Sequence, residues 1–280
     1  MKGNGKTGTL PGLAYGFRIA GIDCPYLQRA GDETRPLLTV THTVSRDGDG
    51  ARAPSPGTTA LALTGGGRLV LDRKTRKAGF ETPERLDADE LVHPYLAPAA
   101  AVMAGWQGWN AFHAGAFARG GRAIAILGKR ERGKSTLLAA LALAGVEIVT
   151  DDVLVIDRGA AHPGPRCIDL RRAGAERAFR DAPLEPSRSG ERLRLGLPAL
   201  PIAPELAGWV ALAWGERLEL EPLRPGARLH RLASAHSRAG SPSEEALLEL
   251  ARLPGWELRR PPGVELLPET CRRLLELVAG

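Results

Sequence analysis

The first 92 residues carry short runs of apolar and β-branched side chains separated by turn residues, a pattern typical of strands. These runs predict strands at Gly12–Ala20, Leu37–Val44, Leu61–Thr64 and Leu69–Asp72. Three consecutive glycines, Gly65 to Gly67, predict a hairpin between the last two runs. We therefore predict a β-rich N-terminal region over residues 1–92, with residues 93–280 forming a second domain.

From residue 93 onward, strand-like and helix-like patterns alternate, as they do in α/β proteins. The continuously apolar run Arg122–Leu127 predicts a buried central strand. The helix expected after it, Gly133–Ala144, is apolar all round from Leu137 onward and should be buried. Other helices are predicted at Ala97–Trp109, Glu244–Leu253 and Glu269–Val278, and other strands at Val146–Val149, Val153–Ile156, Trp209–Trp214 and Arg217–Leu220. The stretch 158–190 predicts loops with a short helix near Arg171–Phe179.

Composition narrows the class of protein. The chain has 280 residues, of which 43% are hydrophobic and 25% charged, as in globular proteins. The net charge of +6 is spread along the chain without a basic block, so we expect no nucleic-acid partner. The cysteines Cys24, Cys167 and Cys271 lie far apart, which favours a reducing compartment. Because there is neither a signal-peptide pattern nor an apolar run long enough to span a membrane, we expect a cytoplasmic protein without a membrane partner.

The run from Gly128 to Ser135 fits the pattern G-x-x-x-x-G-K-[ST], between a predicted strand and a predicted helix. Glycines let such a loop turn its backbone N–H groups inward, and the helix N-terminus favours phosphate. Lys134 can reach the β- and γ-phosphates of a nucleotide, and the Ser135 hydroxyl can bind Mg²⁺. The variable positions Lys129 to Arg132 are all charged. Glu131 stands where a third glycine is common, so we expect its carboxylate to point outward.

Two aspartates, Asp151 and Asp152, end a predicted strand only 17 residues after Lys134. One such carboxylate can hold Mg²⁺, and the other can orient and deprotonate an attacking hydroxyl. Neighbouring side chains on a strand face opposite sides, so the pair should lie at a strand end or bend. His113 is a third candidate, about ten residues before the strand that leads into the loop. Two weaker matches, Gly3-x-Gly5-x-x-Gly8 and the DGDG run at 47–50, lack the flanking residues that a nucleotide or calcium site needs.

The residues from His113 to Asp157, with the GKST run and the Thr-Asp-Asp-Val run inside them, resemble the catalytic core of HPr serine kinase and its relatives. Phosphoenolpyruvate carboxykinases share a similar core and a similarly short gap between the phosphate-binding loop and the two aspartates. The segments Leu13–Ala20 and Pro254–Val278 are similar to HPr-kinase-like proteins from peptide-modification gene clusters, including lasso-peptide clusters. The resemblance implies an α/β fold with a P-loop core, in which a central β-sheet is flanked by helices and joined to the β-rich N-terminal region.

The resemblance also implies residue roles. ATP would be bound by Gly128, Arg132, Gly133, Lys134, Ser135 and Thr136, and Mg²⁺ by Ser135 and Asp152. The catalytic residues would be Asp151, His113 and Lys134, although the order of the two aspartate roles stays open. Arg166 and Arg238 are candidates for charge stabilisation or peptide binding, the alternative being surface arginines.

The expected function is ATP- and Mg²⁺-dependent phosphorylation of a serine hydroxyl in a peptide or small protein, lasso-type precursor peptides included. Two alternatives remain open: a small-molecule kinase or carboxykinase-like enzyme, and a non-catalytic nucleotide-binding regulatory module. Because the relatives often oligomerise, a homo-oligomer is expected as well.

Overall fold

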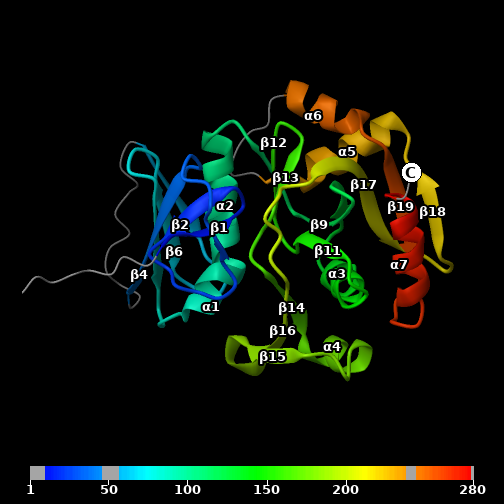
Figure 1. Ribbon diagram of the computed structural model, residues 1–280, viewed down its shortest axis with the longest axis horizontal. Coiled ribbons are helices and arrows are strands. Elements are labelled where there is room, and N and C mark those ends of the chain that lie inside the picture. Colours follow the sequence, from blue (N-terminus) through cyan, green and yellow to red (C-terminus); the bar gives the residue numbers. More distant parts are fainter. Residues whose placement is uncertain (1–9, 46–56, 238–243, 279–280) are drawn as a thin grey trace, which may run out of the picture.

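The computed structural model describes residues 10–45, 57–237 and 244–278 (Figure 1). It is a mixed α/β structure with three sheets. The glycine pattern at Gly3 to Gly8, the DGDG run at 47–50 and Arg238 lie outside the described residues.

The first sheet has the strand order β3-β1-β2-β4-β7-β6-β5 and lies on the left of Figure 1. The predicted strand Gly12–Ala20 is in fact a hairpin, because Tyr15 and Gly16 have positive φ values of 56° and 83° and reverse the chain. The hairpin predicted at Gly65 to Gly67 is confirmed. The strands are β1 Gly12–Ala14, β2 Phe17–Ala20, β3 Gln28–Arg29, β4 Leu37–Val44, β5 Thr58–Ala62, β6 Arg68–Asp72 and β7 Lys77–Thr82.

A helical segment lies between the first sheet and the second (Figure 1). It consists of α1 Ala88–Glu90, the π-helical turn η1 Leu91–Tyr95 and α2 Leu96–Trp106. Apolar side chains along α2, such as Leu96 and Met103, share one core with Phe17 and Phe80 of the first sheet. Because α2 ends at Trp106, three residues before the predicted end, Trp109 leaves the helix and packs against Phe17. The domain division at residue 92 stays a prediction.

The second sheet has the order β11-β9-β10-β17-β13-β12-β8, and β17 also pairs with β19, which pairs with β18. Its centre is parallel: β10 runs beside β17, and β17 beside β19. Its strands are β8 Asn110–Phe112, β9 Ala114–Arg119, β10 Arg122–Leu127, β11 Glu147–Thr150, β12 Leu154–Asp157, β13 Ala160–His162, β17 Glu205–Trp214, β18 Glu219–Pro222 and β19 Gly255–Arg260. The predicted central strand Arg122–Leu127 is thus confirmed, with buried neighbours on both sides.

Helices cover both faces of this sheet. On one face α3 Lys134–Leu143 and α7 Leu267–Glu276 share a core with Ile124 and Val210. On the other face α5 Pro225–Ala235 and α6 Glu244–Arg252 share a core with Ala123 and Trp209. The expectation that the apolar helix is buried on all sides is wrong in part, because Leu143 at its last turn is 43% exposed.

The third sheet, at the bottom of Figure 1, overturns the prediction of loops over 158–190. It contains β14 Cys167–Arg171, β15 Leu184–Ser187 and β16 Arg192–Gly196, next to α4 Arg172–Ala178 and the 3₁₀ turn η2 Arg188–Gly190. Apolar positions alternate along its strands, so that Ile168, Leu170, Leu193 and Leu195 join the core around α3. The short helix predicted near Arg171–Phe179 is confirmed.

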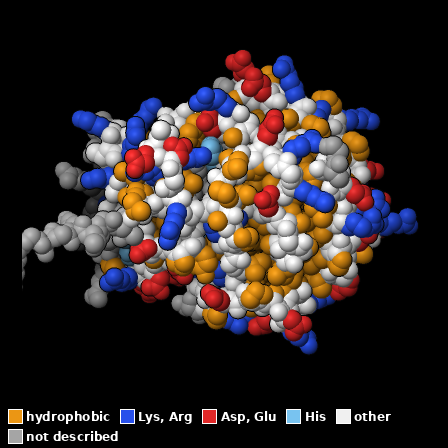
Figure 2. Space-filling view, in the orientation of Figure 1, with side chains coloured by type: hydrophobic (Ala, Val, Ile, Leu, Met, Phe, Trp, Pro, Cys, Tyr) orange, Lys and Arg blue, Asp and Glu red, His pale blue; other side chains and the backbone are white. Residues whose placement is uncertain are grey.

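Charged side chains of both signs are interspersed over the described part of the face in Figure 2, with no single basic patch in this view. Among the described helices, none combines the length and the apolar character needed to cross a bilayer.

Candidate phosphate-binding site

The loop Gly128–Gly133 connects the central strand β10 to helix α3, at the carboxyl ends of the parallel strands β10 and β17. Gly133 caps the helix with φ of 75°, in the left-handed region that favours glycine. A side chain at this position would also collide with the guanidinium of Arg260 at the end of β19. The local sequence therefore needs glycine here, and it leaves the first amides of α3 facing the loop.

Glu131 points outward, as expected from the sequence. Its side chain is 67% exposed, and its carboxylate accepts a hydrogen bond from Arg171 Nη2 at 2.6 Å. The negative charge in the loop is thus paired with a cation on the third sheet. A phosphate in the loop would consequently not face an unpaired carboxylate at this position.

Lys134, His113 and Asp152 are linked by hydrogen bonds. Lys134 Nζ donates to His113 Nε2 at 3.1 Å and lies 3.4 Å from the carbonyl oxygen of Gly128. His113 Nδ1 donates to Asp152 Oδ1 at 3.1 Å, which requires the imidazole to carry a proton on Nδ1. Burial lowers the pKa of the Lys134 ammonium, although Asp152 and Asp151 oppose that effect. The structure therefore brings together three side chains that the sequence separates by up to 39 residues.

The two aspartates occupy a bend directly after β11, as their adjacency requires. Asp151 is only 5% exposed. Its burial, together with the negative charge of Asp152, raises the pKa of its carboxyl from 3.8 to about 7, while Ser135 and Lys134 act in the opposite direction. Asp152 is more exposed, at 34%. Burial alone would raise the pKa of Asp152, but the hydrogen bond from His113 and nearby positive charges hold it well below its usual range. The two environments thus move the pKa values of the neighbouring carboxyl groups apart, upward for Asp151 and downward for Asp152.

Oxygen donors around the bend suit a magnesium ion. Asp151 Oδ1 is buried and has no hydrogen-bond partner among the described residues. The Ser135 hydroxyl is near enough to Asp151 to lower its pKa, and Asp152 is next in the chain. In the described ranges, no three His, Cys, Asp or Glu side chains are arranged so that they could hold a metal ion by themselves. Magnesium does not require one, because it commonly binds through one or two carboxylates, waters and substrate phosphates.

The other predicted nucleotide-binding residues surround the same loop. Gly128 and Arg132 line a cavity beside it, and the Arg132 guanidinium lies 6.0 Å from the ring centre of Trp214. Ser135 and Thr136 occupy the first turn of α3 and are half-buried. The predicted catalytic, nucleotide-binding and metal-binding residues are thus within the loop, the first turn of α3, the aspartate bend or the junction between β8 and β9.

Arg166 does not belong to this site. Its side chain is buried, with donors to the carbonyl oxygens of Pro198, Val149 and Ile148 at 2.9, 3.2 and 2.8 Å. The alternative of a surface arginine is therefore wrong, and the donors that charge stabilisation or peptide binding would need are bound to backbone carbonyl oxygens. Arg166 instead fixes the end of β11, from which the aspartate bend begins.

Sequence reasoning missed His93. This imidazole is buried in η1, and burial lowers its pKa, whereas Asp169 and Asp152 act to raise it. Its carbonyl oxygen accepts a hydrogen bond from Arg194, which also binds Asp169 through two nitrogens at 2.6 and 3.0 Å. His93 thus lies between the aspartate bend and a buried ion pair of the third sheet. No local pattern around a lone histidine before a proline indicates this position.

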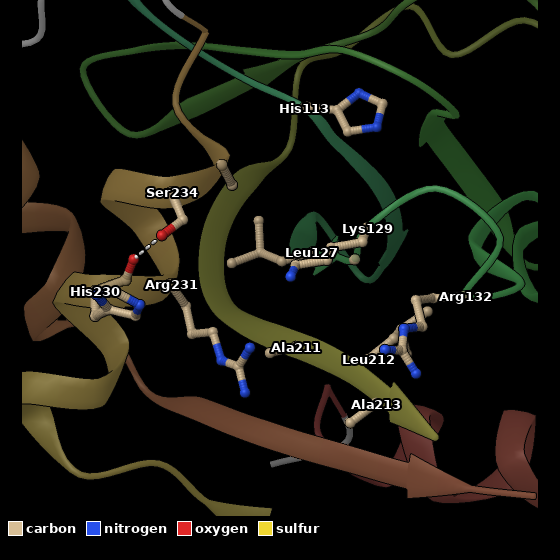
Figure 3. Close-up of a pocket in the computed structure, with 12 residues that line it drawn as sticks. His113, Leu127, Lys129, Arg132, Ala211, Leu212, Ala213, His230, Arg231 and Ser234 are labelled. Carbon is tan, nitrogen blue, oxygen red and sulfur yellow. Dashed lines mark hydrogen bonds between the residues drawn. The ribbon is translucent and has the colours of Figure 1, made fainter.

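A cavity of about 460 Å³ adjoins the loop on the side of the sheet that α5 covers (Figure 3). Its floor is apolar and includes Leu127 of β10 and Ala211 and Ala213 of β17. His230, Arg231 and Ser234 of α5 also line the cavity, and His113, Lys129 and Arg132 lie on the side of the loop. Its volume is within the range of small-molecule sites.

Comparisons with known proteins leave the family open. No protein-family model matches the chain, and no curated protein sequence matches it. Among solved structures, the HPr(Ser) kinase/phosphatase from Coxiella burnetii aligns with 60% of this chain and 96% of its own, at 15% identity and a TM-score of 0.30. A likeness of this degree carries no argument about the site.

Proposed function

We propose that this protein is an ATP- and Mg²⁺-dependent phosphotransferase that phosphorylates a serine hydroxyl of a peptide or small protein. One observation carries the proposal: Lys134, His113 and the Asp151–Asp152 bend converge at the loop between β10 and α3. A phosphate-binding loop and a buried carboxyl with a pKa near 7 are what phosphoryl transfer to a hydroxyl needs in one place.

Phosphate binding would fall to the loop and to Lys134. The backbone N–H groups at the start of α3 have no partners within the helix and favour negative charge. Lys134 Nζ is held beside the loop by His113 and the Gly128 carbonyl oxygen, so its position is fixed in advance. Binding through preset groups avoids reorganisation when charge develops on the transferred phosphoryl group.

Asp151 would serve as the general base. A carboxylate with a pKa of about 7 can accept a proton at neutral pH and is far more basic than an ordinary aspartate. The serine oxygen would form a bond to the γ-phosphorus, the bond from phosphorus to the β,γ-bridging oxygen would break, and the serine proton would move to Asp151. Asp152, held ionised by His113, would be the metal ligand together with Ser135. A bound Mg²⁺ would neutralise charge on the phosphates.

The serine acceptor and its peptide or protein carrier rest on the family resemblance of the residues His113 to Asp157. The buried, basic carboxyl favours catalysis over a purely regulatory nucleotide-binding module, because binding alone does not need a proton acceptor.

Thermal unfolding with and without Mg-ATP tests nucleotide binding. Ligand at 100 times its Kd stabilises a protein by about 2.7 kcal/mol, or roughly 5–10 °C in midpoint for a chain of this size. We expect this shift in the wild type and in Arg130→Ala, an exposed loop residue, and its loss in Lys134→Ala. An equal shift in all three proteins, or none in the wild type at millimolar Mg-ATP, would contradict the proposal.

Phosphate transfer is then measured with γ-labelled ATP and a panel of serine-containing peptides and small proteins. Label should appear on serine, and it should not appear when that serine is replaced by alanine. Transfer only to free hydroxy compounds would instead support the small-molecule kinase alternative.

A further inference from the structure

The cavity between α5 and the loop is separate from the aspartate bend. His113 lies between the two: its ring contacts Lys134 and Asp152, and its side chain also lines the cavity. Neither Asp151 nor Asp152 is among the described residues that line the cavity. The loop therefore has two sides, an acidic one at the end of β11 and a second one under α5.

The second side carries positive and apolar groups. Lys129, Arg132 and Arg231 line the cavity, and no carboxylate does so among the described residues. Arg231 is partly neutralised, since it donates to Glu257 of β19. In Figure 3 its guanidinium extends from α5 toward Ala211 of β17. Such a cavity favours a ligand with a flat or apolar body and an anionic end directed at the loop.

Transfer geometry decides which ligand belongs on which side. In phosphoryl transfer, the attacking and leaving oxygens lie roughly in line on opposite sides of the phosphorus. Asp151, the base that the proposed function assigns to the attacking hydroxyl, directly follows β11 and so lies on the acidic side. The leaving nucleoside diphosphate should then extend to the other side of the loop, where the cavity under α5 opens on Gly128 and Lys129.

We propose that this cavity holds the nucleoside of the nucleoside triphosphate, with base and ribose between α5 and the alanines Ala211 and Ala213 of β17. The inference rests on the proposed function and adds the position of the base. The small side chains are what leave the space open, since Ala211 and Ala213 face the same side of β17 at alternate positions. The acceptor then approaches from the side of Asp151.

Filling the cavity separates base binding from phosphate binding. Ala213→Leu places a larger side chain on the floor of the cavity and so fills part of it. Ser234→Leu does the same from α5, at an exposed position outside the core. Ala233→Leu adds the same side chain on the same helix at an exposed position that does not line the cavity, and is the matched control. Binding of Mg-ATP and of magnesium tripolyphosphate, which has no nucleoside, is measured by calorimetry for each protein.

Both cavity variants should bind Mg-ATP at least ~10-fold more weakly than the wild type, because an added side chain in a fitted pocket costs that much or more. Their affinity for tripolyphosphate should stay within about twofold, as should both affinities of Ala233→Leu. Tripolyphosphate binding reports whether the loop is intact in each variant. Two cavity variants are tested so that the inference can still be judged if one of them does not fold.

Unchanged Mg-ATP affinity in both cavity variants would overturn the inference, and so would an equal loss for both ligands. Unchanged Mg-ATP affinity with lost acceptor phosphorylation would assign the cavity to the acceptor instead. If the wild type binds neither ligand, the proposed function fails and the inference fails with it. If the wild type binds both and the variants do not discriminate, only the inference fails.

Discussion

Asp151 should make the folded protein less stable than it would be with asparagine at this position. The carboxyl is 5% exposed, and its pKa is raised from 3.8 to about 7. A raised pKa means that folding disfavours the ionised form. We predict that Asp151→Asn, which removes the ionisation and keeps the shape, raises the free energy of unfolding at neutral and alkaline pH.

The size of the effect follows from the two pKa values. A difference of about three corresponds to about 4 kcal/mol, because each pKa unit is worth 1.36 kcal/mol. Below pH 3.8 the group is protonated in both states, and the cost is absent. The cost grows between pH 3.8 and about 7, because in that range Asp151 is ionised in the unfolded chain and mainly protonated in the folded one. Above that range the cost is constant. At pH 8 we expect a rise of roughly 8–16 °C in the thermal midpoint, at about 2–4 °C per kcal/mol for a chain of this length.

Asp152→Asn is the matched control, because it changes the net charge by the same amount one residue away. The pKa of Asp152 is lowered, so folding favours its ionised form, and the substitution should lower the midpoint at pH 8. Both midpoints are measured from pH 4 to 8 by circular dichroism without ligand. A lower midpoint for Asp151→Asn at pH 8, or a gain that does not shrink toward pH 4, would refute the reasoning. In the proposed enzyme the same variant should lose about 100-fold or more in transfer rate.

Two further predictions concern stability away from the loop. Burial, with the charge of Arg35 beside it, lowers the pKa of His162 from 6.5 to about 4. As the pH falls, His162 therefore takes up a proton in the unfolded chain before it does so in the folded one. The free energy of unfolding should decrease by up to about 3 kcal/mol as the pH falls from above 6.5 toward 4. His162→Phe should flatten that acid loss in urea unfolding at pH 7 and 4.5, and an unchanged loss would contradict the assignment. Arg194 and Asp169 form an ion pair whose side chains are each 2% exposed. Arg194→Met should cost about 3 kcal/mol or more in urea unfolding. Arg272→Met, which breaks ion pairs with Glu269 and Glu276 on the exposed side of α7, should cost much less, and equal costs would show that burial is not the cause.

The loop and its surroundings could be predicted because their signals are local. Arg122–Leu127 is apolar at nearly every position, and a buried parallel strand needs that pattern. Gly133 and Lys134 follow at a spacing set by the loop itself. The bend at Asp151 follows from the two adjacent aspartates, and the outward Glu131 from charge repulsion. Each of these inferences needs only residues that are neighbours in the chain.

The third sheet could not be predicted, because its strands are rich in arginine and their signal is weak. Alternation at Ile168 and Leu170 is short, and the charged residues between them suggest solvent. Arg194 nevertheless lies in the core, because Asp169 and the carbonyl oxygen of His93 satisfy its donors. Arg166 is buried for the same reason. A buried arginine depends on partners that are distant in the sequence, and residue type alone favours the surface.

The pKa of Asp151 depends on the same distant contacts. Tyr15 of the first sheet is fully buried, and Asp152 and Asp151 add to the effect of burial in raising its pKa, which places the turn between β1 and β2 close to the aspartate bend. Asp169 of the third sheet adds to the raised pKa of Asp151. Gly115 of β9 has no side chain to keep that strand away from the Asp151 backbone. Segments from all three sheets therefore surround the bend, and desolvation by them is the largest cause of the basic carboxyl. The sequence from His113 to Asp157 supplies the reacting groups, but the environment that would make Asp151 a base comes from the rest of the chain.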